Sequence, residues 1–170
     1  MRKLLVSTGL VGVVVLGLMA ANTGAASLAA VASGSVTLHA SNFGGPNGIN
    51  RTFSFSANEA SNGTVTGQMA LRTFSGNIAT GKLNCMTIEG NQAILGGVYT
   101  TFSQDPTQVG TTFAFAIQDN PDMTTFVNFP FSSTPCQDFL PNLGYVNIDA
   151  ALADQGIPIS TGNIIIRQLG

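Results

Sequence analysis

The sequence predicts an all-β fold, an antiparallel barrel of about eight short strands closed around one hydrophobic core. Beyond residue 33, apolar residues alternate with Thr, Ser, Asn and Gln, which is the two-residue period of a half-buried strand. Gly, Asn or Pro interrupts this alternation at intervals of roughly ten residues, where turns between short strands are expected. The 20 Gly and 7 Pro among 170 residues also disfavour long helices.

A two-layer β-sandwich is the alternative architecture. Only 8% of the residues are charged, so few Lys or Glu side chains are available to protect an exposed sheet edge from pairing with another chain. A closed barrel has no such edge, and we therefore favour the barrel over the sandwich.

The first part of the chain has the pattern of a secretory signal peptide. Arg2 and Lys3 precede an apolar run over residues 4–19, and small residues follow the run. A membrane anchor needs about 20 apolar residues. This run is shorter and contains Gly, Ser and Thr, so cleavage is favoured over a retained anchor. The small residues offer two cleavage sites, one before Ser27 and one before Ser33.

Cleavage divides the chain into two parts. Residues 1–26 are predicted to be the signal peptide, or residues 1–32 if the later site is used, and residues 33–170 are predicted to form a single β domain. Four of the six Lys and Arg residues remain in the mature part against all eight acids, which gives a net charge of −4. We therefore expect a mildly acidic protein, secreted or held in the cell envelope, with no membrane span after cleavage.

The first predicted strands follow directly from the alternation. Residues 36–40 form the first and residues 52–57 the second, separated by a loop of Gly, Asn and Pro over residues 41–48. Asn-Gly at residues 62–63 is a strong hairpin signal and leads into a third strand over residues 65–72.

Residues 81–88 and 92–101 form the next predicted pair of strands, joined by a three-residue turn with a central Gly. In the first of them apolar residues fall on both parities, with Cys85 on one and Met86 on the other. We therefore expect these strands to be covered on both faces. Gly-Gly at residues 96–97 predicts a bulge or a sharp bend.

The last third of the chain contains the only helix predicted outside the signal peptide, a short one near the C-terminus. Asp149 is expected to cap this helix and Gly156 to end it. The predicted elements here are a strand over 112–118, a turn over 119–122, an edge strand over 126–131, a strand over 143–148, the helix over 150–155 and a final strand over 163–167.

Five large side chains are predicted to share one core. Each of them alternates with small or polar neighbours, and a strand sends alternate side chains to opposite faces. They are Phe53, Phe55, Phe113, Phe115 and Ile117.

Cys85 and Cys136 are the only cysteines, and both lie in the exported part. An oxidising compartment would pair them, so we expect a Cys85–Cys136 disulfide. Two free buried thiols are one alternative. A metal site that includes His39 is another, although it would need more soft ligands than these three residues supply.

Several short motifs spread over residues 43–167 carry a family resemblance. They are Phe-Ser-Phe-Ser-Ala at 53–57, Gly-Thr-Val-Thr-Gly at 63–67, the stretch 81–93 that contains Cys85, Asp-Asn at 119–120, and Cys136. In these motifs the chain resembles a group of small, uncharacterised secreted bacterial proteins. The resemblance implies a compact β-barrel domain with the two cysteines bridged, and it implies no activity and no catalytic residue. The turn after Asp119 lacks the Gly-rich extension of that group.

Composition and motifs argue against the common chemistries. Six scattered Lys and Arg residues do not form the basic footprint that nucleic acids require. His39 is the only histidine, and no Gly-x-Ser-x-Gly elbow is present to build a nucleophilic triad around it. Gly-Gly-Pro at residues 44–46 leads into a strand rather than the helix N-terminus of a phosphate-binding loop. We therefore assign no catalytic residue.

The acidic residues suggest two further sites, and their spacing supports neither. Glu59 and Glu89 lie at predicted strand ends, where carboxylates are usually solvated rather than paired across a glycosidase cleft. Asp119, Asn120 and Asp122 offer oxygen atoms to Ca²⁺, which needs about six to eight such ligands, and no EF-hand spacing is present. No metal and no cofactor are expected.

The leading hypothesis is therefore a non-catalytic binding or structural module with a neutral, hydroxyl-rich surface. Its expected partner is a small-molecule ligand or a component of the cell envelope, and not a nucleic acid. The alternatives are a carrier that holds a small apolar ligand inside the barrel, and an enzyme such as a cyclase or isomerase with a few polar groups at the barrel mouth.

Overall fold

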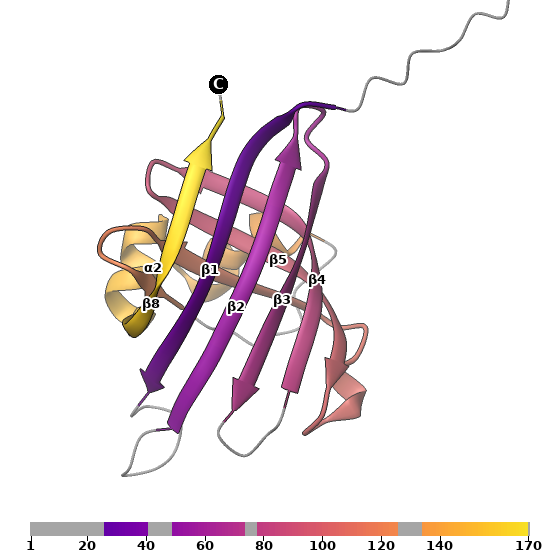
Figure 1. The fold of residues 1–170 in the computed structure, drawn as a ribbon, viewed down its shortest axis with the longest axis vertical. Coiled ribbons are helices and arrows are strands. Elements are labelled where there is room, and N and C mark those ends of the chain that lie inside the picture. The colour runs from indigo at the N-terminus through magenta and orange to yellow at the C-terminus, as the bar shows by residue number, and fades with distance from the viewer. Residues whose placement is uncertain (1–25, 41–48, 74–77, 126–133, 170) are drawn as a thin grey trace, which may run out of the picture.

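The computed structural model describes residues 26–40, 49–73, 78–125 and 134–169. Within them, eight antiparallel strands follow one another around a closed barrel in the order of the sequence (Figure 1). Two short α-helices lie against one side of this barrel. The predicted barrel is confirmed, the alternative sandwich is wrong, and the prediction of a single helix near the C-terminus is also wrong.

The elements have the following bounds. The strands are β1 (Leu28–Ala40), β2 (Ile49–Ala60), β3 (Val65–Thr73), β4 (Ile78–Glu89), β5 (Gln92–Phe102), β6 (Thr112–Gln118), β7 (Met123–Thr124) and β8 (Ile157–Gln168). The helical segments are the 3-10 turn η1 (Pro106–Gln108), α1 (Pro135–Leu143) and α2 (Ile148–Gln155).

The region before β8 differs most from the sequence-based prediction. The predicted strand over residues 143–148 is wrong, because its first residue ends α1 and its last begins α2. Pro135, which lacks an N–H group, fits the first turn of α1, and Gly144 ends the helix in the left-handed region with φ 77°. The predicted edge strand over residues 126–131 lies outside the described residues.

The predicted helix over residues 150–155 is confirmed as part of α2. Its N-cap is Asn147 rather than Asp149, because the Asn147 side chain accepts a hydrogen bond from the backbone N–H of Ala150 at 2.9 Å. Asp149 instead lies in the first turn, where a negative charge interacts favourably with the helix dipole.

The predicted core is confirmed. Phe53 and Phe55 on β2 and Phe113, Phe115 and Ile117 on β6 are all buried in one cluster inside the barrel. The ring centroids of Phe53 and Phe115 lie 4.9 Å apart in an edge-to-face arrangement, which aromatic rings favour. Because β2 and β6 are four strands apart around the barrel, these rings connect opposite walls.

Two glycines make room for the rings. A Cβ atom at Gly34 of β1 would lie 2.7 Å from the ring of Phe55, and one at Gly81 of β4 would collide with the ring of Phe113. The inner wall consists of bare backbone at these two positions, and the rings can therefore approach it closely.

A bulge in β4 explains why its apolar residues fall on both parities. The register with β5 shifts between Leu83 and Cys85, so Asn84 has no partner there. Leu83 and Met86 consequently both belong to the barrel core, whereas Cys85 packs against the helices outside. For β4, the expectation of cover on both faces is thus replaced by a change of parity along one strand.

A second hydrophobic cluster lies outside the barrel, under α1 and α2. Ile94 of β5 and Ala114 and Ala116 of β6 are buried there together with Phe139 and Ile148 from the two helices. Both faces of β5 and β6 are therefore covered, as the sequence predicts for residues 92–101.

The predicted disulfide is confirmed and fixes α1 to the barrel. Cys85 at the β4 bulge is bonded to Cys136 in the first turn of α1, with the two Cα atoms 6.0 Å apart. Gly96 of β5 lies close beside the bridge, since a Cβ atom there would lie 2.8 Å from Sγ of Cys85. Neither of the alternatives, free thiols or a metal site with His39, is compatible with this bond.

Two carboxylates from the β6–β7 connection complete the seam between that part of the barrel and β8. Among the described residues, β7 pairs with β8 over only two residues, and no other described strand pairs with that edge of β8. Asp122 accepts a hydrogen bond from the backbone N–H of Ile164, and Asp119 accepts one from Ile166, each at 3.2 Å. Side-chain acceptors therefore replace part of a strand ladder here.

Removal of the disulfide should destabilise the barrel strongly. The bridge closes a loop with a sequence separation of 51 residues, for which we expect the Cys85→Ala, Cys136→Ala double variant to lose roughly 2–4 kcal/mol of unfolding free energy. Urea denaturation of both proteins tests this value. A double variant as stable as the oxidised wild type would contradict the role given to the bridge.

Asp122→Ala should weaken the seam. Ile164 is fully buried, and its N–H would lose its acceptor, at a cost of about 1–3 kcal/mol. Glu89→Ala, which removes an exposed carboxylate at the end of β4, is the control and should change stability by less than about 0.5 kcal/mol. Equal unfolding midpoints for the two variants would mean that the carboxylate does not hold the seam.

Candidate functional site

Most of the acidic side chains have structural partners. Asp119 and Asp122 hold the seam, and Asp149 accepts a hydrogen bond from Gln92 of β5. Asp105 caps η1, and its hydrogen bonds with Thr107 and Gln108 hold its pKa below the ordinary value. These acids are therefore engaged in the fold rather than gathered at a reaction centre.

Among the residues that the structure describes, no three His, Cys, Asp or Glu side chains gather as a metal site would require. Asp122, one of the three residues considered for Ca²⁺, accepts hydrogen bonds through both carboxylate oxygens, from the backbone N–H groups of Ile164 and Asn120. The backbone of His39 pairs with Asn50 in β1 and β2, and its side chain lies outside the described part of the structure.

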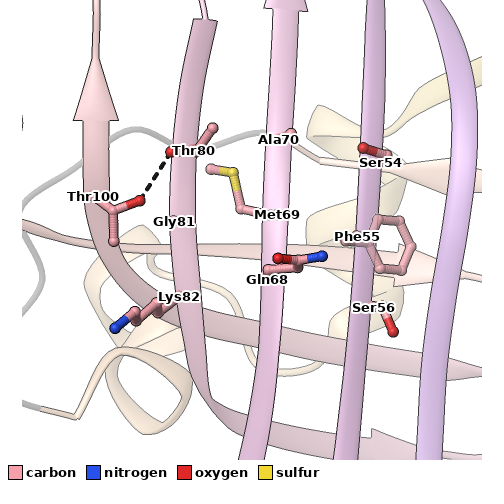
Figure 2. Close-up of a pocket in the computed structure, with 10 residues that line it drawn as sticks. All are labelled: Ser54, Phe55, Ser56, Gln68, Met69, Ala70, Thr80, Gly81, Lys82 and Thr100. Carbon is pink, nitrogen blue, oxygen red and sulfur yellow. Dashed lines mark hydrogen bonds between the residues drawn. The ribbon is translucent and has the colours of Figure 1, made fainter.

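A groove of about 570 Å³ crosses the outer face of β2, β3, β4 and β5 (Figure 2). Ala70 and the backbone of Gly81, whose missing side chain would point into the core, line it between the polar side chains. Phe55 and Met69 contribute little beyond their backbone, because their side chains are buried in the barrel core. The polar residues that border the groove are Ser54, Ser56, Gln68, Thr80, Lys82 and Thr100.

The strand register brings these polar side chains together. Gln68 lies opposite Ser56 on one side and Lys82 on the other, so three strands place polar groups in one row. Next to this row, the hydroxyl of Thr80 lies 2.9 Å from that of Thr100 and 2.6 Å from that of Thr101. The groove therefore presents linked hydroxyls, an amide and a single positive charge.

The hydroxyl surface continues beyond the groove onto β1. There the register pairs Ser33 with Ser56, Ser35 with Ser54, and Thr37 with Thr52. Hydroxyl and amide groups both donate and accept hydrogen bonds, so this face matches a partner with many hydroxyls better than a charged one.

Tyr99 places a buried polar group in the barrel interior, apart from this outer face. Tyr99 of β5 is only 1% exposed, and its ring lies 4.6 Å from that of Phe113 and 5.2 Å from that of Phe102, between centroids. Within the described residues the Tyr99 hydroxyl has no hydrogen-bond partner. Burial raises the pKa of Tyr99, so the phenol stays protonated.

Charged side chains occupy the two ends of the inner face of β2. Arg51 and Glu59 share the inward parity of Phe53 and Phe55 and flank them in sequence. The Nε atom of Arg51 is buried, and desolvation lowers the pKa of its guanidinium. Glu59 lines a hollow of about 510 Å³ at the opposite end of the barrel, together with Met86 and other residues.

Sequence reasoning found the disulfide but neither the groove nor the buried phenol. The alternating Ser and Thr residues were visible as an outer face, yet only the register shows which of them are neighbours. Nothing in the sequence around Tyr99 distinguishes an inward phenol without a partner from a tyrosine whose hydroxyl reaches solvent. No helix within the described ranges is long and apolar enough to cross a membrane.

Tyr99→Phe should stabilise the protein. The substitution keeps the ring but removes a hydroxyl that loses its water on folding without gaining a partner, so we expect a gain of about 1–3 kcal/mol in urea denaturation. Tyr145→Phe is the control, because the Tyr145 hydroxyl donates a hydrogen bond to Asp154 and its removal should bring no gain.

Tyr99→Phe should also change how the free energy of unfolding depends on pH. The unfolded chain releases the tyrosine proton near pH 10, whereas the folded protein retains it at Tyr99, so wild-type stability should fall as the pH rises above about 10. Tyr99→Phe should lose this part of the decline. An identical alkaline slope in both proteins would show that Tyr99 titrates normally.

Comparison with known proteins gives no relative from which a role for the groove or for Tyr99 can be transferred: no family model, no curated protein and no solved structure matches this chain.

Proposed function

We propose that this barrel is an exported, non-catalytic module that binds a neutral, polyhydroxylated component of the cell envelope, a glycan, through the groove on β2–β5. The observation that carries the proposal is the composition of that groove. Its lining consists mainly of hydroxyl and amide side chains beside Ala70 and the backbone of Gly81, and Lys82 is the one charged residue among its described lining residues.

The placement of the other residues supports a binding rather than a catalytic role. Asp119 and Asp122 serve the seam, and four Phe rings fill the middle of the barrel. A packed interior and engaged acids supply neither a nucleophile with its base nor a pair of carboxylates facing a substrate. The chemistry that remains is surface recognition by hydrogen bonds.

The groove favours a polymer over a small sugar. A single neutral hydrogen bond in water contributes only about 0.5–1.5 kcal/mol, and the groove residues offer no exposed aromatic ring for stacking. Many such contacts along a repeating partner are therefore needed for useful affinity. The hydroxyl rows on β1 and β2 extend the surface in the direction that such a chain would follow.

Glycan binding should depend on the groove and not on salt. In co-sedimentation with insoluble cellulose, chitin and α-glucan, we expect the variant Ser56→Ala, Gln68→Ala, Thr100→Ala to bind at least about tenfold more weakly than wild type to the glycan that is retained, since three hydrogen bonds are lost. Raising the salt concentration should leave wild-type binding unchanged, because the partner is neutral.

The matched control removes three exposed polar groups on α1 and α2, away from the groove and the hydroxyl rows: Gln137→Ala, Asn142→Ala, Gln155→Ala. This variant should bind as wild type does. Equal retention of both triple variants, or no retention of wild type on any of the polysaccharides, would overturn the proposal.

Export is part of the same proposal, and the fold favours one of the two cleavage sites. Residues 28–32 belong to β1, pair with β2 and β8, and contribute the buried Ala30 and Ala32 to the core. Cleavage before Ser33 would remove them, whereas cleavage before Ser27 leaves the strand whole. The carbonyl of Ser27 also accepts a hydrogen bond from the backbone N–H of Ser61 at 2.7 Å.

N-terminal sequencing of the exported protein should therefore find Ser27 as the first residue. A chain shortened to begin at Ser33 should be markedly less stable in urea denaturation, because five residues of β1 are missing. Recovery of Ser33 or Met1 at the N-terminus of folded, exported protein would contradict this assignment.

A further inference from the structure

We propose that the hollow around Glu59, at one mouth of the barrel, is a second binding site, which takes an organic cation with an apolar chain. The described residues that line this hollow are all different from those that line the outer groove, so the proposal is independent of the glycan. It rests on the hollow itself, on an inward carboxylate without a partner, and on the apolar side chains beside that carboxylate.

The hollow extends across the mouth from one wall of the barrel to the other. Ala30 on β1, Glu59 on β2 and Gln168 on β8 line it on one side, where Figure 1 shows the start of β1 and the ends of β2 and β8 together at the top of the view. Met86 and Ile88 on β4 line it on the other side. β4 and β8 are four strands apart in the closed order of eight, so these residues belong to opposite walls.

The size of the hollow fits a small molecule. Its volume of about 510 Å³ lies within the range of about 300–1,000 Å³ that is typical of ligand sites. It lies over the end of the packed core rather than within it, since the buried side chains of Ala30 and Met86 belong to both the hollow and the core. A ligand can therefore enter without displacing the Phe rings.

Glu59 directs its side chain toward this hollow. It continues the inward alternation of Phe53, Phe55 and Ala57, all three of which are buried in the core. Across β1 and β2, Glu59 also pairs with Ala30, another core residue. Glu59 itself is half-buried, so its carboxylate lies at the boundary between the core and solvent.

The carboxylate of Glu59 has no hydrogen-bond or ion-pair partner among the described residues. No Lys or Arg is among the described residues that line the hollow. Arg167 of β8 is exposed and has the opposite parity to Ile164 and Ile166, which pack in the core, so its side chain points away from the mouth. A carboxylate that has lost part of its water without gaining a cation attracts a positively charged ligand.

Hydrocarbon surrounds this charge. Met86 is a buried core residue and Ile88 packs against the core, so the wall that faces Glu59 across the mouth is apolar. An alkyl chain attached to the cation can therefore bury its surface against this wall.

The rim of the mouth continues the apolar surface. Leu28 and Leu169 are 45% and 42% exposed, and they are two of the four large hydrophobic side chains that are exposed in the described part of the chain. Leu28 pairs with Ala60, and the backbone N–H of Leu169 donates a hydrogen bond to the carbonyl of Ala29. Because Ala29 and Ala60 both line the hollow, the two leucines flank its entrance.

These features define the ligand class as a quaternary or primary amine with an alkyl chain. The ammonium group pairs with Glu59, and the chain contacts Met86, Ile88 and the two leucines. A metal ion does not fit, because Ca²⁺ needs about six to eight oxygen ligands and the described lining contains a single carboxylate. An anion is repelled by the same carboxylate.

Calorimetric titration of the exported protein with octyltrimethylammonium bromide tests the site, and we expect saturable binding of one cation per chain. Two further ligands separate the charge from the chain. Sodium octanoate has a similar chain with the opposite charge, and tetramethylammonium has the charge without the chain. Each should bind at least about tenfold more weakly than octyltrimethylammonium.

Glu59→Gln keeps the size of the side chain and removes its charge, so it should weaken binding of the cation at least about tenfold. Glu89→Gln is the matched control, because Glu89 is an exposed acid at the same end of the barrel and is not among the lining residues. It changes the net charge equally and should bind as wild type does. The double variant Leu28→Ser, Leu169→Ser should weaken binding about threefold or more, since apolar contact at the rim is lost.

The proposal is overturned if wild type does not bind octyltrimethylammonium, if octanoate binds as tightly, or if Glu59→Gln binds the cation within twofold of wild type. Equal weakening in Glu59→Gln and Glu89→Gln would also overturn it, because the effect would then come from net charge alone. The triple variant of the outer groove should bind the cation as wild type does, so a loss of glycan retention alone refutes only the groove.

Discussion

The packing of phenylalanine rings across the barrel interior is the interaction on which the rest of the structure depends. Phe53 and Phe55 on one wall meet Phe115 on the opposite wall, with ring centroids 4.9 Å and 5.6 Å from it. The rings fit because Gly34 and Gly81 leave the facing backbone bare. A strand alternates its side chains, so filling the interior in this way also decides which residues face outwards.

The outer surface divides into two regions as a consequence. Over β5 and β6, Ile94, Ala114 and Ala116 point outwards and the two helices cover them, with α1 held by the disulfide at the β4 bulge. On β1–β4 the outward residues are mostly Ser, Thr and Gln, and the proposed glycan groove lies among them and Thr100 of β5. The bulge at Asn84 is the point on β4 where the parity changes between these two regions.

The two ends of the inner face of β2 carry opposite charges. A cation at Arg51 and an anion at Glu59 flank an apolar middle, and the enclosed phenol of Tyr99 lies toward the cationic end. A buried polar group costs stability unless it is satisfied, so the Tyr99 hydroxyl is a cost to the fold. The outer groove and the packed core thus use opposite faces of the same strands.

The sequence by itself determined the barrel, five of its core residues and the disulfide. These depend on local alternation, on turn residues and on the presence of only two cysteines, all of which can be read without knowing which strands are neighbours. The same rules failed over residues 143–148, where the sequence predicts a strand and the structure has the connection from α1 to α2. They also missed α1 itself, which is held by packing in the cluster with Ile94 and by the bond to Cys136. Only the tertiary structure decided the carboxylate seam, the hydroxyl row from Ser56 to Lys82 and the isolation of the Tyr99 hydroxyl, because each depends on the register between strands or on contacts between residues far apart in the chain.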